Sequence, residues 1–166
     1  SVIDFTDSAK PVEIAYFDRG PVFDDELVVG GYWSAYYYAG AIYGTEIIRG
    51  LDVFNLIPSE YLSANEIAAA ALADQGGVFN PQQQFAVTWP AEPVVAQAYL
   101  DQRQRAGALD AQGRQQWNDA LERAGRLLAA GESNPALGRE LEQLAAASAG
   151  TDGLAGVVQG IAARLR

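Results

Sequence analysis

The residues of this chain best suited to binding a ligand are aromatic side chains gathered between positions 32 and 43. Aromatic faces stack on sugars and other flat surfaces, and tyrosine hydroxyls can hydrogen-bond at the rim. Alternation along a strand would divide such rings between the two faces of a sheet. Packing inside the protein is the favoured interpretation, and a binding platform is the alternative. The set comprises Tyr32, Trp33, Tyr36, Tyr37, Tyr38 and Tyr43.

Two carboxylates and a guanidinium follow on neighbouring strand candidates. Glu46 and Arg49 precede Gly50, and Asp52 follows it. Two carboxylates that flank a cleft can hydrolyse a glycosidic bond, one as acid and the other as base or nucleophile. A structural ion pair or a position at the rim of a binding surface is the favoured interpretation, because the sequence does not fix the separation of the two carboxylates.

Two further sites have weaker support. Asp24, Asp25 and Glu26 lie beside glycines and could supply oxygen ligands to calcium, but their spacing fits no EF-hand loop, which favours a solvated acidic loop. Ser1 could act as an N-terminal nucleophile with its own amine as base. An arbitrary cleavage point would place a serine there equally well. We therefore expect no catalytic residue, metal site or cofactor.

The composition excludes several kinds of chemistry. The 166 residues include no His, Cys or Met, which removes an imidazole base, a thiol nucleophile and a His or Cys metal site. The net charge of -10 and the absence of a basic patch argue against nucleic acid as a partner. No apolar run approaches the roughly 20 residues of a membrane span. The acids outnumber the bases most strongly in residues 1–62, by 10 to 3.

The first 57 residues are typical of antiparallel strands. They are rich in Val, Ile and aromatic residues and are interrupted by Gly and Pro. Gly40 is the predicted hairpin tip. The predicted strands are Val2 to Thr6, Val12 to Asp18, Trp33 to Ala39, Ala41 to Ile48 and Leu51 to Ile57.

From Ser63 the composition and the 3.6-residue spacing of apolar positions predict about five helices. Ser63 and Glu66 form a capping box, and Gly76-Gly77 should end that first helix. A loop over 78–88 leads to a second helix, predicted to start at Thr88 and Pro90 and to stop at Gly107. The third, fourth and fifth helices are predicted over about 110–130, from Asn134-Pro135, and after Gly150. The short connections predict an antiparallel bundle over residues 63–166, after a strand region over residues 1–62, which makes the fold class α+β.

The strand region resembles a known family. "PVEIAYFDRGP" and "GGYWSAYYYAGAIYGTEIIRGLDVFNLIPSEYLSANEIAAAA" are similar to the C-terminal region of bacterial LVIVD-repeat proteins. "VIDFTDSAKPVEIAYFD" resembles the repeat itself, although Ser8 stands where the repeat usually has Pro. "GGVFNPQQQFAVTWP" is similar to the extension that follows the repeats in some members. The resemblance implies partial blades of a β-propeller in an exported protein, extracellular or periplasmic.

A propeller needs at least four blades of about 40–50 residues, and residues 1–57 supply fewer than two. We therefore expect a non-catalytic structural or protein-interaction module, whose remaining blades lie upstream of Ser1 or in another chain. A carbohydrate-binding or other ligand-binding module that uses the aromatic strand face is one alternative. An extracellular coat or lattice protein, with sheet edges free to pair in a homo-oligomer, is another.

Overall fold

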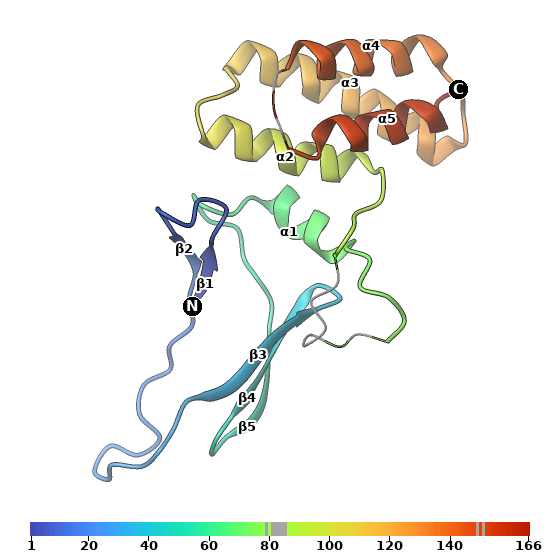
Figure 1. Ribbon diagram of the computed structural model, residues 1–166. Coiled ribbons are helices and arrows are strands. Elements are labelled where there is room, and N and C mark those ends of the chain that lie inside the picture. Colours follow the sequence, from blue (N-terminus) through green and yellow to red (C-terminus); the bar gives the residue numbers. More distant parts are fainter. Residues whose placement is uncertain (79, 81–85, 149, 151) are drawn as a thin grey trace.

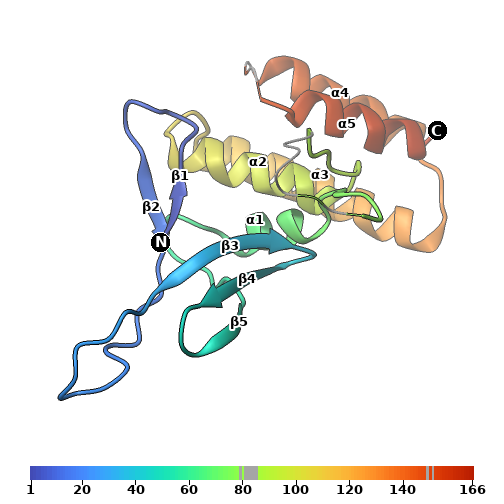
Figure 2. The same cartoon turned by 60° about the horizontal axis from the view of Figure 1, so that its bottom comes forward.

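The computed structural model describes residues 1–78, 80, 86–148, 150 and 152–166. Within these described residues, five strands, all before residue 55, are followed by five helices, which confirms the predicted α+β class. The strands form two separate antiparallel sheets, and α1 lies between the second sheet and the other helices (Figures 1 and 2). Several residues of the predicted loop over 78–88 lie outside the described part of the chain.

The first sheet is a hairpin of β1, Val2–Asp4, and β2, Val12–Ala15. The predicted second strand, Val12 to Asp18, is too long. Residues 16–20 leave the sheet because Phe17 packs on the ring of Phe54 and Arg19 binds Asp52, both in the second sheet. The predicted first strand is also too long, since the chain turns after β1 with the Thr6 N–H donating to the Asp4 carboxylate.

The second sheet is a three-stranded meander of β3, Tyr32–Tyr38, β4, Ala41–Glu46, and β5, Gly50–Phe54. Ala39 and Gly40 connect β3 to β4, both with positive φ, at 48° and 88°. A two-residue turn of that kind fits the twist of paired strands. The predicted tip at Gly40 is confirmed, whereas the predicted extensions to Ile48 and Ile57 are wrong, because residues 47–49 form the next turn and β5 ends at Phe54.

Side-chain caps define where most of the helices begin. The helices are α1, Ala64–Ala71; α2, Pro93–Arg105; α3, Ala111–Ala130; α4, Pro135–Ala147; and α5, Leu154–Arg164. The capping box of Ser63 and Glu66 is present, and Asp110 and Asn134 cap α3 and α4 through their side chains. These caps satisfy N–H groups that have no partner within the helix.

The predicted end of the first helix and the predicted start of the second are wrong for the same reason. The Asp74 N–H donates to the Thr88 carbonyl at 2.7 Å, and this bridge lies between α1 and α2. Residue 74 therefore cannot continue the first helix to Gly76-Gly77, and Thr88 is not the start of the second. Instead Glu92 is the N-cap of α2, and Pro93 occupies its first turn.

The hydrophobic core belongs to the helices. α2 packs against α3 and α5, and α4 packs against the same two helices, which closes a four-helix arrangement; α1 packs on α2. Trp117, Leu121 and Leu141 are almost completely buried inside it. Within residues 1–61 only Gly44 and Glu46 are buried, so no large apolar side chain of these residues lies in a core.

Candidate functional site

The register of the second sheet assigns its side chains to two faces. Tyr36 pairs with Tyr43, which pairs with Val53, and one step along the strands Tyr37 pairs with Ile42, which pairs with Phe54. Successive side chains of a strand point to opposite faces, so these two rows lie on different sides. We call the side of Phe54 the covered face and the side of Val53 the open face.

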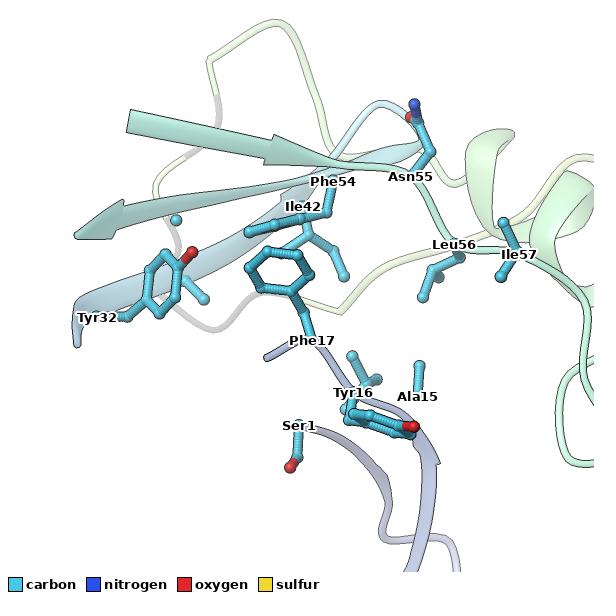
Figure 3. A pocket seen from close by; sticks show the side chains of 13 residues that line it. Ser1, Ala15, Tyr16, Phe17, Tyr32, Ile42, Phe54, Asn55, Leu56 and Ile57 are labelled. Atoms are coloured by element: carbon cyan, nitrogen blue, oxygen red, sulfur yellow. The ribbon is translucent and has the colours of Figure 1, made fainter. Parts of the chain in front are cut away.

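The covered face is packed by residues 16–20, which we call the strap. The rings of Phe17 and Phe54 lie with centroids 4.6 Å apart, and Tyr32 meets Phe54 edge to face at 5.9 Å (Figure 3). The ring of Tyr32 occupies the space that a side chain at Gly44 would need, since a Cβ there would lie 2.7 Å from it. Glycine at this position therefore permits the aromatic packing.

A network of polar contacts anchors the strap to β5. The guanidinium of Arg19 donates to both oxygens of Asp52, at 3.0 and 2.6 Å, and lies over the ring of Phe17. The hydroxyl of Tyr32 donates to the same carboxylate. The bonds from Tyr32 and Arg19 hold the pKa of Asp52 below its ordinary value.

Glu46 is buried and is occupied by the backbone. Its carboxylate accepts from the N–H groups of Gly31 at 2.8 Å and Ile48 at 2.9 Å, and also from that of Arg49. The bond from Gly31, then that from Arg49, lowers the pKa of Glu46. This carboxylate thus closes the turn between β4 and β5, and it holds the start of β3 against that turn.

The predicted trio of Glu46, Arg49 and Asp52 does not form one cluster. The Arg49 guanidinium donates to the carbonyl of Pro21 at 2.7 Å, and the ion pair of Asp52 is made with Arg19. Sequence reasoning did not identify Arg19 as a site residue. Its only signal is that it is one of three basic residues among the first 62.

The aromatic set is divided by the sheet. Tyr36, Tyr38 and Tyr43 share the open face, whereas Tyr37 shares the covered face with Glu46 and Asp52. Trp33 lies at an irregularity in the register of β3 and is exposed. Tyr32 also lies on the covered face, where its hydroxyl donates to Asp52. Tyr32 and Tyr37 therefore share a face with the two carboxylates, and the sheet separates only the open-face tyrosines from them.

Two hollows adjoin the sheets. A cavity of about 330 Å³ lies between the end of β2, the strap and the covered face, with Ser1 at its edge (Figure 3). A groove of about 550 Å³ lies between β1, α1 and α2 and includes Phe5, Tyr61 and Trp89. No local pattern in the sequence indicates this groove, because its residues come from separate segments of the chain.

An ion pair lines the groove beside α1 and α2. Arg105 donates to both oxygens of Glu66, at 2.7 and 3.0 Å, and Glu66 also accepts from the Ser63 N–H as part of the capping box. Burial would raise the pKa of Glu66, but the bonds from Arg105 and Ser63 outweigh it, and the pKa is lowered. Glu66 and Arg105 are thus paired with each other, and the third charged residue of the groove, Asp4, accepts from the Thr6 N–H.

The acidic residues Asp24, Asp25 and Glu26 lie in an exposed loop between the strap and β3. No three carboxylates converge on a common point in the described part of the chain, so the structure gathers no calcium site there. None of its described helices combines the length and the apolar character needed to cross a membrane.

Comparison of the chain with protein-family models, with curated proteins and with solved structures finds no match. The similarity to LVIVD-repeat proteins stays a prediction from the sequence.

Proposed function

We propose that this chain is a non-catalytic protein-interaction module whose strand region, residues 1–62, forms the interface. One observation carries the proposal. Of the twenty large apolar side chains that are exposed in the described chain, seventeen lie in residues 1–61, although those residues contribute no apolar side chain to a core. Apolar surface of this extent is typical of interaction sites.

The helices and the strands differ in how completely they bury their apolar residues. The bundle encloses its own core of buried side chains. A two-stranded sheet and a three-stranded sheet are close to the smallest that persist in water, and each leaves two edge strands unpaired. A second polypeptide that covers the open face or pairs with an edge would remove this surface from water.

The resemblance to LVIVD-repeat proteins suggests the nature of that polypeptide. Two- and three-stranded antiparallel sheets are incomplete relative to the four strands of a propeller blade. We propose that further blades, upstream of Ser1 or in another chain, complete these sheets, and that the protein is exported to the periplasm or the cell exterior. The helices would then close or cap the sheet assembly.

A non-catalytic role fits the state of the carboxylates. Glu46 is buried and accepts three backbone N–H groups, and Asp52 is bound by Arg19 and Tyr32. Acids and bases that serve in catalysis must exchange a proton with substrate, and these two carboxylates instead hold a turn and a strap.

Native mass spectrometry of the protein isolated from its source, combined with hydrogen exchange, tests the proposal. We expect the 17.7 kDa chain to be accompanied by a second polypeptide in fixed stoichiometry. Amides of β3 to β5 should be protected in that complex and should exchange rapidly once the chain is separated, while amides of α2 to α5 stay protected in both states.

Two other outcomes would redirect the interpretation. A homo-oligomer with protected strands would favour the coat or lattice alternative, in which copies of the chain pair their sheet edges. A lone monomer whose strands are protected as strongly as its helices would overturn the proposal, because the strand region would then need no partner.

A further inference from the structure

The loop of residues 21–30, which we call the acidic arm, is fixed at both ends. The Arg49 guanidinium donates to the carbonyl of Pro21 at 2.7 Å. At the other end the Gly31 N–H donates to Glu46 at 2.8 Å, and the Gly31 carbonyl accepts from the Ile47 N–H at 3.0 Å. The arm therefore starts and finishes at the turn between β4 and β5, and it extends away from the rest of the molecule as the light blue loop in Figures 1 and 2.

The arm presents large apolar side chains to solvent. Phe23 is 51% exposed, Val29 is 75% exposed and Leu27 is completely exposed. A loop that is held at its base but leaves much of the surface of these three side chains in water gains little from them within the chain. Side chains of this kind become favourable when a partner surface covers them.

The same loop carries charge that the chain does not neutralise. Asp24, Asp25 and Glu26 form no hydrogen bond or ion pair with any described residue. The basic side chains of the helices are already engaged, since seven of the eight arginines after residue 62 form an ion pair with a carboxylate. Three acids next to three exposed apolar side chains thus face solvent without a charged partner among the described residues.

We propose that the acidic arm docks on a partner polypeptide that presents an apolar surface bordered by lysines and arginines. The proposal rests on the proposed function, a protein-interaction module, and adds the chemistry of the partner. Like charges repel at an interface and opposite charges steer association. A second copy of this chain fits poorly, because it carries a net charge of -10 and seven of its eight arginines after residue 62 already form an ion pair. An anionic membrane surface would repel the arm for the same reason.

An amphipathic helical peptide built of leucine and lysine is a defined probe of this chemistry, and its leucine and glutamate counterpart is the control probe. We expect the full chain to bind the leucine-lysine peptide, with an affinity that falls as salt is added, and not to bind the leucine-glutamate peptide. Binding would be measured by isothermal titration, and its location by changes in amide chemical shift confined to residues 21–30.

Variants of the arm separate its apolar and acidic contributions. Leu27→Ser/Val29→Ser and Asp24→Asn/Asp25→Asn/Glu26→Gln should each weaken binding of the leucine-lysine peptide by about tenfold or more. All five positions are solvent-exposed, so the thermal midpoint should not change.

Control variants with matched chemistry lie elsewhere on the strand region. Leu51→Ser/Val53→Ser removes two exposed apolar side chains from β5 on the open face, and Glu13→Gln/Glu60→Gln removes two exposed acids. Both should bind the peptide with the affinity of the unaltered chain. Equal weakening in these controls would show attraction by net charge or by apolar surface in general and would overturn the assignment to the arm.

Two other results would overturn the proposal: no binding of the leucine-lysine peptide, or equal binding of both peptides. A third would assign the arm to a lipid surface instead: binding of the unaltered chain to phosphatidylcholine vesicles that is lost in Leu27→Ser/Val29→Ser.

Failure of the arm proposal is distinguishable from failure of the proposed function. If native mass spectrometry shows a heteromeric complex that survives the arm variants but not Leu51→Ser/Val53→Ser, the interaction module stands and the role of the arm is excluded.

Discussion

Arg19 and Asp52, 33 positions apart in the sequence, form a two-point ion pair with N–O distances of 3.0 and 2.6 Å. A parallel pair of bonds between a guanidinium and a carboxylate fixes orientation as well as distance. The pair holds the strap on the covered face and so places Phe17 on Phe54. One contact between distant segments therefore determines which face of the second sheet is open.

Removing the charge of Asp52 should release the strap. In Asp52→Asn, Arg19 loses its carboxylate partner, and the ring-proton shifts of Phe17, which reflect packing on Phe54, should move toward those of an unfolded chain in NMR spectra. The thermal midpoint of the helices should be unchanged, because no strap residue belongs to the bundle core. Glu13→Gln, at an exposed acid of β2, is the matched control, and unchanged Phe17 shifts in Asp52→Asn would contradict the anchoring role.

Truncation of a leucine should lower the free energy of unfolding in the helical bundle but hardly at all on the second sheet. Leu141 is fully buried among the helices, so Leu141→Ala should lower the free energy of unfolding by about 2–5 kcal/mol through the lost burial and the cavity left behind. Leu51 is 63% exposed, and Leu51→Ala should change the free energy of unfolding by no more than about 0.5 kcal/mol. Urea denaturation of the isolated chain provides the comparison, and similar losses in both variants would refute the absence of a core in the strand region.

Two glycines of α5 should respond in opposite ways to alanine. A Cβ at Gly156 meets no atom within 4 Å, so Gly156→Ala should stabilise the protein by about 0.5–1 kcal/mol through helix propensity. A Cβ at Gly160 would lie 2.4 Å from that of Ala91, so Gly160→Ala should force the helix away from that segment and destabilise the protein. The thermal midpoints of the two variants show directly whether each substitution stabilises or destabilises the protein. Stabilisation by both would contradict the close approach of α5 to residue 91.

Acid should destabilise the fold through two ion pairs of the helices. Burial would raise the pKa of Glu66 above its ordinary value of 4.5, but the bonds from Arg105 and the Ser63 N–H lower it. The bond from Arg103 lowers the pKa of Asp152 below its ordinary value of 3.8. Because both pKa values are lower in the folded state, the unfolded chain binds more protons, and the stability that these groups contribute is lost as pH falls below those values. The urea midpoint should thus be steady from neutral pH down to about pH 5 and then decline.

The variant Glu66→Gln tests whether the loss of stability in acid comes from Glu66. Glu66→Gln should be less stable at neutral pH, because Arg105 loses its charged partner, and its stability should fall less steeply in acid than that of the unaltered chain. Glu60→Gln, which removes an exposed acid, should keep the original pH profile. A profile of Glu66→Gln parallel to the original would show that Glu66 does not contribute to the acid sensitivity.

Much of the helical part could be predicted from local sequence. The capping box of Ser63 with Glu66 and the helix start at Asn134-Pro135 depend on chemistry within a few residues, and both are present where the sequence places them. Asp110, the predicted approximate start of the third helix, is its N-cap in the structure. The helix boundaries that were wrong, around Gly76 and Thr88, depend on the bridge between Asp74 and Thr88, which joins segments 14 residues apart and leaves no local signal.

The sequence by itself determined the α+β class and the hairpin tip at Gly40, because composition, periodicity and turn chemistry are local properties. Only the tertiary structure decided that Asp52 pairs with Arg19, that Glu46 closes a turn, and that Tyr43 shares the face of Tyr36. These outcomes follow from strand register and from contacts between distant segments. A shift of one residue in register would exchange the two faces, so alternation alone could not say which of them the strap covers.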